Sequence, residues 1–166
     1  MRLTEFKESG YSLHRLDYIL LELCRLIIEG QKSNPKKYGM VAACVLGPNN
    51  QSSTSTSTYK DSKWHHAERN AIENYTNRYG EIPKGSIIIV TLSPCSEFND
   101  ITSSERAGLS CTELINSSTI RNVYCGYIDP TQGDDHHSNH QFTLKETQNT
   151  HIRELCEKFA NTFLKP

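Results

Sequence analysis

A nearly unbroken apolar run at Ile87–Leu92 constrains the fold of this chain more than any other segment. A strand that is covered on both faces reads as a continuous apolar run, whereas a strand with one solvent face alternates apolar and polar residues. Val123–Ile128 forms a second apolar run, and we predict another strand there. The two runs therefore indicate a sheet that packs against layers of helices.

The rest of the chain supplies helices and a hairpin. Val41–Leu46 is a predicted strand that ends in the turn signal Gly47–Asn50. The alternating Ser and Thr residues of Gln51–Tyr59 could form a low-complexity linker, but β-branched threonines after a turn favour the second strand of a hairpin. Four segments are predicted as helices: Tyr11–Glu29, which we expect to stop at Gly30, His65–Tyr75, Thr112–Ser117 and Asn149–Phe163.

Strands and helices thus alternate along the chain, and this order predicts an α/β fold with a mixed β-sheet. Two polar segments, Gln31–Tyr38 and Pro130–His140, are predicted as loops. The length of 166 residues and the lack of a visible repeat favour a single domain over residues 1–166.

The charges of the chain are balanced, with 18 Lys and Arg residues against 19 Asp and Glu residues and a formal net charge of -1. Non-specific affinity for nucleic acid comes from neutralising many phosphates, so this balance disfavours a nucleic-acid partner. A local basic edge stays compatible with the sequence, and it would consist of Lys32, Lys36, Lys37 and Lys60.

No apolar run approaches the roughly 20 residues that a membrane-spanning helix needs. The segment Met1–Gly10 is polar and lacks the apolar centre of a signal peptide. We therefore expect a cytoplasmic protein without a membrane partner. In a reducing compartment, its six cysteines are expected to serve a metal or the core rather than disulfides.

Two short motifs and one later cysteine carry the candidate chemistry. His66–Glu68, with the sequence His-Ala-Glu, opens a predicted helix, and Ser93–Cys95, with the sequence Ser-Pro-Cys, follows the apolar strand. Cys111 stands at the start of a further predicted helix. One imidazole and two thiolates would supply the three protein ligands of a catalytic zinc site, which keeps a fourth position for water. We therefore expect Zn²⁺ as the cofactor, held by His66, Cys95 and Cys111.

A carboxylate that does not touch the metal must then move the protons. Glu68 lies two residues after His66, near the same helix end. It is the candidate that takes a proton from the water and delivers it to the reacting groups of the substrate. Helix N-termini also favour the thiolate forms of Cys95 and Cys111.

These residues resemble the signature of the cytidine deaminase-like zinc deaminases, in which H-x-E is followed by P-C-x-x-C. The similarity extends to the order of elements over most of the chain. It implies a three-layer cytidine deaminase-like fold, with a mixed β-sheet flanked by helices. It also implies a zinc-dependent hydrolase that deaminates a cyclic amidine, and a homodimer or higher homo-oligomer.

One departure from the signature points to a subfamily. Fifteen residues, 96–110, separate the two cysteines, where the signature has two. Such an insertion resembles the one found in the riboflavin-biosynthesis pyrimidine deaminases. Three further features resemble that family: Asn34-Pro35 with the segment that follows it, Asp129-Pro130, and the basic residue Arg106 within the insertion. The resemblance implies substrate contacts by Asn34, Arg106 and Asp129, with Arg106 on the phosphate.

The chain has no segment of reductase size, which makes it similar to the fungal stand-alone deaminases of this pathway. Bacterial stand-alone deaminases would be equally short. The implied substrate is a small phosphorylated pyrimidine, 2,5-diamino-6-ribitylamino-4(3H)-pyrimidinone 5'-phosphate. Cytidine, deoxycytidylate, guanine or a base within RNA or DNA are alternative substrates for the same chemistry. A non-catalytic zinc-binding module is a further alternative, which the presence of Glu68 disfavours.

Other residues near these motifs allow two interpretations. Cys24 and Cys125 are alternative third ligands, although their apolar surroundings favour a place in the core. His65 and Trp64 could line the pocket, or could serve as a cap and a packing residue. A polar cluster could form a second metal site, although a solvated loop is the favoured interpretation: Asp134, Asp135, His136, His137 and His140.

Overall fold

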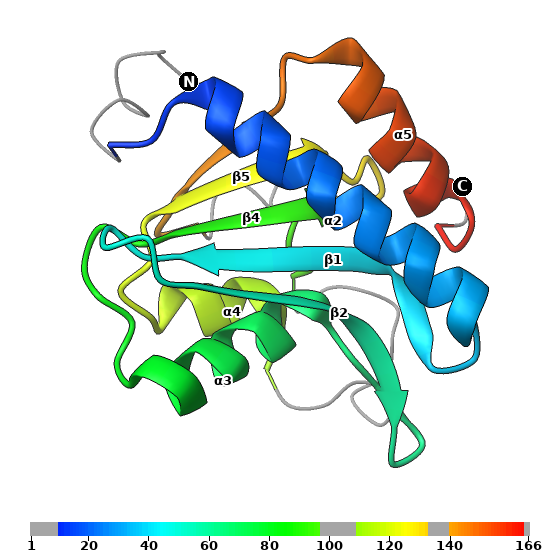
Figure 1. Cartoon of the computed structure of the whole chain (residues 1–166), viewed down its shortest axis with the longest axis horizontal. Coiled ribbons are helices and arrows are strands. Elements are labelled where there is room, and N and C mark those ends of the chain that lie inside the picture. The colour runs from blue at the N-terminus through cyan, green and yellow to red at the C-terminus, as the bar shows by residue number, and fades with distance from the viewer. Residues whose placement is uncertain (1–9, 97–108, 133–139, 165–166) are drawn as a thin grey trace.

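The computed structural model describes residues 10–96, 109–132 and 140–164, which form a six-stranded sheet with helices on both faces (Figure 1). The strands are β1 (Tyr38–Leu46), β2 (Ser52–Lys60), β3 (Lys63–His65), β4 (Ile87–Leu92), β5 (Asn122–Tyr127) and β6 (Thr143–Glu146). The helices are α2 (Leu13–Ser33), α3 (Ala67–Tyr79), α4 (Cys111–Asn116) and α5 (Thr150–Asn161).

The sheet has the strand order β3-β2-β1-β4-β5-β6 and is mixed. The pairs β4–β5 and β5–β6 are parallel, whereas β1 runs antiparallel to both β2 and β4. The prediction of an α/β fold with a mixed sheet is therefore confirmed. This topology brings the C-terminal ends of β4 and β5 to the same edge of the sheet as the N-terminal end of β1.

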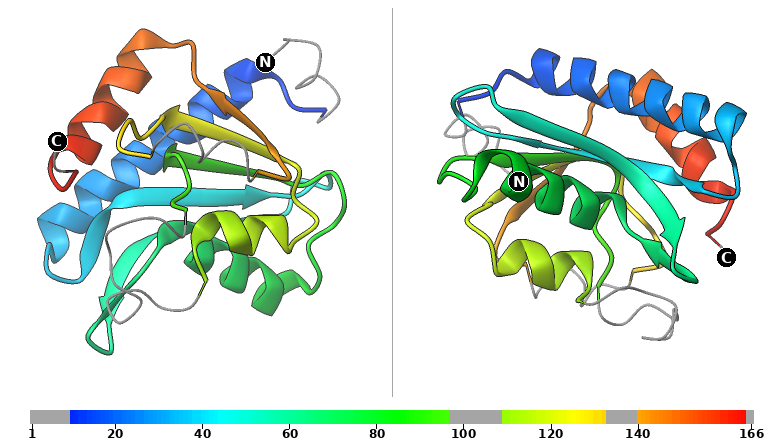
Figure 2. Two further views of the ribbon diagram at one scale, coloured as in Figure 1. Left: turned by 180° about the vertical axis from the view of Figure 1, so that it is seen from behind. Right: turned by 60° about the horizontal axis from the view of Figure 1, so that its bottom comes forward.

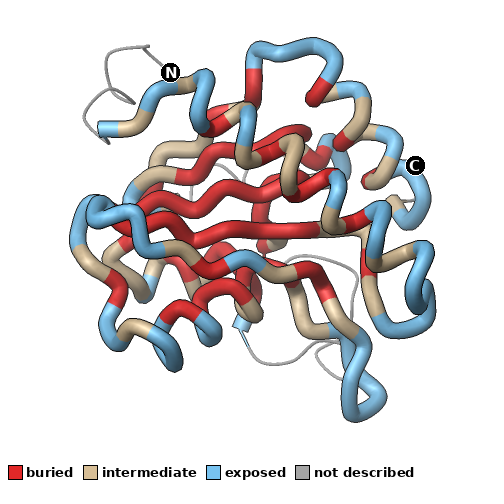
Figure 3. The backbone as a smooth tube through the Cα atoms, in the orientation of Figure 1, coloured by how far each residue is buried: buried red, intermediate tan, exposed pale blue. Residues whose placement is uncertain are grey.

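Two apolar cores lie on opposite faces of the sheet. Helices α2 and α5 pack on one face, and α3 and α4 pack on the other (Figure 2). Within β4, Ile87 and Ile89 belong to the first core, whereas Ile88 and Val90 belong to the second. All six residues of β4 are buried, and the central strands form the most buried part of the chain (Figure 3). This double coverage explains the unbroken apolar run of the sequence.

Helix α2 does not stop at Gly30, and this prediction is wrong. The helix continues to Ser33, and the carbonyl of Gly30 accepts a hydrogen bond from the backbone N–H of Asn34 at 2.9 Å. A Cβ atom at position 30 would lie 3.0 Å from Cβ of Tyr38. The glycine therefore allows close packing against the first residue of β1 instead of ending the helix.

The hairpin of β1 and β2 is confirmed, so the interpretation of the Ser/Thr segment as a linker is wrong. Its turn is closed by a hydrogen bond from the N–H of Gly47 to the carbonyl of Gln51 at 2.8 Å, and Asn50 has a φ of 66°. Strands β3 and β6 were not predicted, because these short edge strands have no apolar run. No helix among residues 10–96, 109–132 and 140–164 has the length and apolar character needed to cross a membrane.

Candidate metal centre

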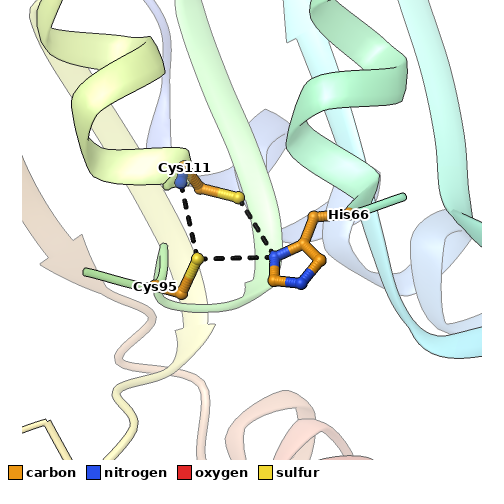
Figure 4. Close-up of side chains that lie close together, drawn as sticks. All are labelled: His66, Cys95 and Cys111. Carbon is orange, nitrogen blue, oxygen red and sulfur yellow. Dashed lines mark hydrogen bonds between the residues drawn. The ribbon is translucent and has the colours of Figure 1, made fainter. Parts of the chain in front are cut away.

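His66, Cys95 and Cys111 come together beyond the C-terminal end of β4 (Figure 4). His66 directly precedes α3, Cys95 follows β4, and Cys111 is the first residue of α4. Their side chains point toward one another from three different parts of the fold. The structure thus gathers the three predicted ligands, although His66 and Cys111 are 45 positions apart in the chain.

The distances between the three ligand atoms fit a tetrahedral metal site. Nδ1 of His66 lies 3.4 Å from Sγ of Cys95 and 3.3 Å from Sγ of Cys111. All three ligand atoms lie within 4.8 Å of one another. A tetrahedral zinc ion separates a nitrogen and a sulfur ligand by roughly 3.5 Å, given its usual bond lengths. One imidazole and two thiols are also a donor set that zinc prefers. Within the described parts of the chain, no other such group of His, Cys, Asp or Glu residues occurs.

Local capping places two of the ligands. His66 is the N-cap of α3 in an extended conformation, with φ of -67° and ψ of 151°, and its side chain does not cap the helix. Ser110 is the N-cap of α4 and forms a capping box with Glu113, which starts the helix at Cys111. This Ser-x-x-Glu pattern is a capping signature that can be read from the sequence.

The two thiols differ in acidity before any metal binds. A hydrogen bond from the Cys111 thiol lowers the pKa of Cys95 well below its usual range. The same hydrogen bond, together with burial, raises the pKa of Cys111. The backbone N–H of Cys111 also donates to Sγ of Cys95 at 3.4 Å, which favours the thiolate of Cys95. A cation bound here would draw both thiols into the thiolate form and release protons.

Glu68 lies in the first turn of α3 and is 3% exposed. Burial raises the pKa of Glu68 to about 7, and the neighbouring His66 acts in the opposite direction. A carboxyl group with a pKa near 7 can accept and release a proton at neutral pH, as a general base and acid must. The structure therefore brings a candidate proton carrier next to the ligand His66.

Two loops are joined by hydrogen bonds on both sides of Cys95. The backbone N–H of Asp129 donates to Oγ of Ser93 at 2.9 Å. Further along, Oε1 of Gln132 accepts from the N–H and the Oγ of Ser96 at 3.3 and 2.8 Å. Nε2 of Gln132 donates to the carboxylate of Asp129 at 3.3 Å, so the two residues that hold the Cys95 segment are also bonded to each other. Ser96 and Gln132 are site residues that no local motif in the sequence marks, whereas Ser93 belongs to the predicted Ser-Pro-Cys motif.

We expect Gln132→Ala to weaken zinc binding about 10- to 100-fold, because outer residues that orient metal ligands typically contribute this much. The substitution removes both contacts to Ser96 and frees the segment that carries Cys95. Competition with a chromophoric chelator measures the zinc affinity. Gln51→Ala, in the β1–β2 turn, is the matched control. An affinity equal to that of the unchanged protein would show that Gln132 does not position Cys95.

The three predicted substrate contacts have different surroundings. Asn34 is the exposed C-cap of α2. Asp129 is 6% exposed, and its carboxylate accepts hydrogen bonds from the N–H and the Oγ1 of Thr131 at 2.8 and 2.6 Å. Its position therefore suits a structural role in the turn as well as a substrate contact. Arg106 lies outside the described residues. All three substrate contacts stay predictions.

The structure also shows the surroundings of His65, Trp64 and His140, for which the sequence allowed two interpretations. His65 ends β3 and pairs with Thr58 instead of starting a helix. Trp64 is 37% exposed and packs against Tyr59, with the ring centroids 5.4 Å apart. His140 stacks on Phe142 with a centroid distance of 4.3 Å. The other four members of the polar cluster, residues 134–137, lie outside the described residues.

The sequence model of one family, described as the cytidine and deoxycytidylate deaminase zinc-binding region, matches residues 19–127. The chain belongs to this family. The match contains His66, Cys95 and Cys111, and it agrees with the donor set and geometry of the centre. Zn²⁺ is therefore the cofactor of this deaminase-family site, and the three residues are the ones that would hold it.

Solved structures share the fold at low sequence identity. The diaminohydroxyphosphoribosylaminopyrimidine deaminase/5-amino-6-(5-phosphoribosylamino)uracil reductase of Thermotoga maritima is 23% identical, with a TM-score of 0.60, over 87% of this chain and 41% of that protein. RibD of Acinetobacter baumannii is 19% identical, with a TM-score of 0.66, over 92% and 40%. The Rib2 deaminase of Aspergillus oryzae is 17% identical, with a TM-score of 0.58, over 87% and 96%.

These likenesses confirm the cytidine deaminase-like fold. The chain spans about two fifths of the length of the two bacterial proteins and nearly the full length of the fungal one. A comparison with curated protein sequences gives no match.

Proposed function

We propose that this protein catalyses the hydrolytic deamination of 2,5-diamino-6-ribitylamino-4(3H)-pyrimidinone 5'-phosphate. The observation that carries the reaction type is the buried carboxyl group of Glu68, which lies two residues from the ligand His66 and has a pKa raised to about 7. A structural zinc site has four protein ligands and needs no such acid. Three ligand residues and a buried acid together are what a hydrolytic site requires.

The proposed reaction replaces the amino group of an amidine carbon with oxygen. Zinc, when bound, makes hydroxide available at neutral pH by lowering the pKa of water to roughly 7. Glu68 takes the proton that the water loses and transfers it to the ring nitrogen. The oxygen of the water adds to the amidine carbon. Glu68 then carries the remaining proton of that oxygen to the amino group, the carbon–nitrogen bond breaks, and ammonia leaves as the carbonyl forms. One water is consumed for each ammonia released.

Three features support the substrate assignment. The insertion between Cys95 and Cys111, the pair Asn34-Pro35 and the pair Asp129-Pro130 are similar to features of the riboflavin-pathway deaminases. Asn34 lies in the connection between α2 and β1, and the start of β1 lies at the same edge of the sheet as the end of β4, which the zinc ligands follow. A small phosphorylated pyrimidine also needs few basic contacts, which suits a net charge of -1.

Deoxycytidylate is the second candidate substrate. The matching family is described by cytidine and deoxycytidylate deaminases, and its match covers residues 19–127. The amidine carbon of cytosine undergoes the same replacement of an amino group by oxygen, so the assigned roles of Glu68 and of the metal ligands stay the same.

Ammonia release from the zinc-loaded protein tests these proposals. The diaminopyrimidine phosphate, deoxycytidylate and a transfer RNA are supplied separately under the same conditions. We expect rapid release from the first, at a rate that falls roughly 10³- to 10⁴-fold in Glu68→Gln. Release from deoxycytidylate alone would replace the riboflavin assignment with the second candidate. Release from none of the three, by a protein with stoichiometric zinc, would overturn the proposed substrate class.

A further inference from the structure

Two buried cysteines outside the metal centre face each other across a helix interface. Cys24 lies in α2 and Cys156 lies in α5, and their Sγ atoms are 3.7 Å apart. Both are free thiols, and each is 1% exposed. They belong to the apolar core between the sheet and the helices α2 and α5. This pair is therefore separated by the sheet from Ala67 and Ile115, which belong to the helices of the metal centre.

The position of the Cys156 side chain depends on Gly126 in β5. A Cβ atom on Gly126 would lie 2.2 Å from Sγ of Cys156 and 2.9 Å from its Cβ. The glycine therefore leaves the space into which the Cys156 thiol packs. From there the thiol reaches Cys24, because α5 and α2 lie on the same face of the sheet (Figure 1).

The two sulfur atoms lie in van der Waals contact. A disulfide has an S–S bond of about 2.05 Å, so the observed 3.7 Å must shorten by about 1.7 Å. Rotation of two thiols about their Cα–Cβ bonds moves sulfur atoms over distances of this size without moving a helix. The hydrogen bond from Cys156 lowers the pKa of Cys24, which favours Cys24 as the attacking thiolate.

We propose that Cys24 and Cys156 form an intramolecular disulfide that ties the last helix of the described chain to the first. The co-reactant is a small disulfide such as oxidised glutathione, which reaches the two buried thiols during local opening of α5, the last helix of the described chain. The Cys24 thiolate attacks one of its sulfur atoms and releases one thiol, and the Cys156 thiolate then attacks Sγ of Cys24 and releases the second. Two protein thiols are oxidised, one small disulfide is reduced to two thiols, and the two protons pass to the released thiols.

The bond would close a long loop, since the two cysteines are 132 positions apart. Cross-links that close long loops reduce the conformational freedom of the unfolded chain most strongly. We therefore expect the melting temperature of the oxidised protein to rise by at least about 5 °C. The zinc ligands are held apart from this pair, so zinc content is expected to stay constant during oxidation.

The experiment treats the folded, zinc-loaded protein with oxidised glutathione at graded ratios to reduced glutathione. The protein is alkylated and then digested without reduction, and mass spectrometry of the peptides identifies the cross-linked cysteines. Calorimetry measures the melting temperature. We expect a Cys24–Cys156 peptide and a higher melting temperature, both reversed by a thiol reductant. Cys24→Ala and Cys156→Ala should abolish both changes. Cys125→Ala, which removes a different buried thiol, should retain them.

Three results would overturn the inference. The first is the absence of the Cys24–Cys156 peptide from the folded protein at a glutathione ratio that oxidises the unfolded protein. The second is a cross-link that involves Cys95 or Cys111 together with loss of zinc. The third is a Cys24–Cys156 cross-link with an unchanged melting temperature. The test on the unchanged protein decides the matter even if one of the alanine variants does not fold.

Discussion

Glu68→Gln is expected to retain zinc and to release ammonia roughly 10³- to 10⁴-fold more slowly than the unchanged protein. General acid–base catalysis by one positioned side chain contributes up to about 10⁴-fold, and Glu68 is assigned both proton transfers of the reaction. Glutamine keeps the size of the buried side chain, which is 3% exposed, but it cannot carry a proton. Single-turnover ammonia release and metal analysis of the same sample measure the two quantities.

Glu73→Gln is the control for this prediction. Glu73 lies on the same helix, one turn beyond Arg69, to which it is joined by an exposed ion pair at 3.5 Å. Its replacement should leave the rate and the zinc content unchanged. Loss of zinc from Glu68→Gln would mean that Glu68 is a metal ligand, contrary to its assignment. Turnover close to that of the unchanged protein would show that another group moves the protons.

Cys111→Ala is expected to lose zinc and, with it, the stability that zinc contributes. Metal binds the folded chain far better than the unfolded one, so its binding free energy adds to the free energy of unfolding. At a free zinc concentration 100 times the dissociation constant, this contribution is about 2.7 kcal/mol. Cys111→Ala leaves two of the three ligand atoms that lie within 4.8 Å of one another. Denaturant unfolding with zinc and with a chelator measures the difference.

The unchanged protein should show a clear loss of unfolding free energy when zinc is chelated, whereas Cys111→Ala should show almost none. Cys125→Ala is the matched control, because Cys125 is also buried but lies within β5. It should unfold more easily than the unchanged protein, because it leaves a small cavity, yet keep the response to the chelator. A full zinc response in Cys111→Ala would remove Cys111 from the ligand set.

Local patterns in the sequence were sufficient for the layers of the fold. The run Ile87–Leu92 coincides with β4, since burial on both faces selects apolar side chains at every position. The Ser/Thr hairpin was predictable because its turn and its β-branched residues are adjacent in the chain. The predicted end of α2 at Gly30 was wrong, because the sequence does not distinguish a glycine that ends a helix from one that permits close packing.

The sequence by itself determined the chemistry of the metal centre. The order of His66, Glu68, Cys95 and Cys111 is a motif, and each residue stands beside a helix or strand end that local patterns indicate. Which residues meet was decided only by the tertiary structure. Gln132 binds Ser96, the neighbour of Cys95, across 36 positions of the chain. Cys24 approaches Cys156 in the same way, where two helices far apart in the sequence pack together. Such contacts depend on sheet order and on helix placement, and these long-range arrangements leave no periodic trace in the sequence.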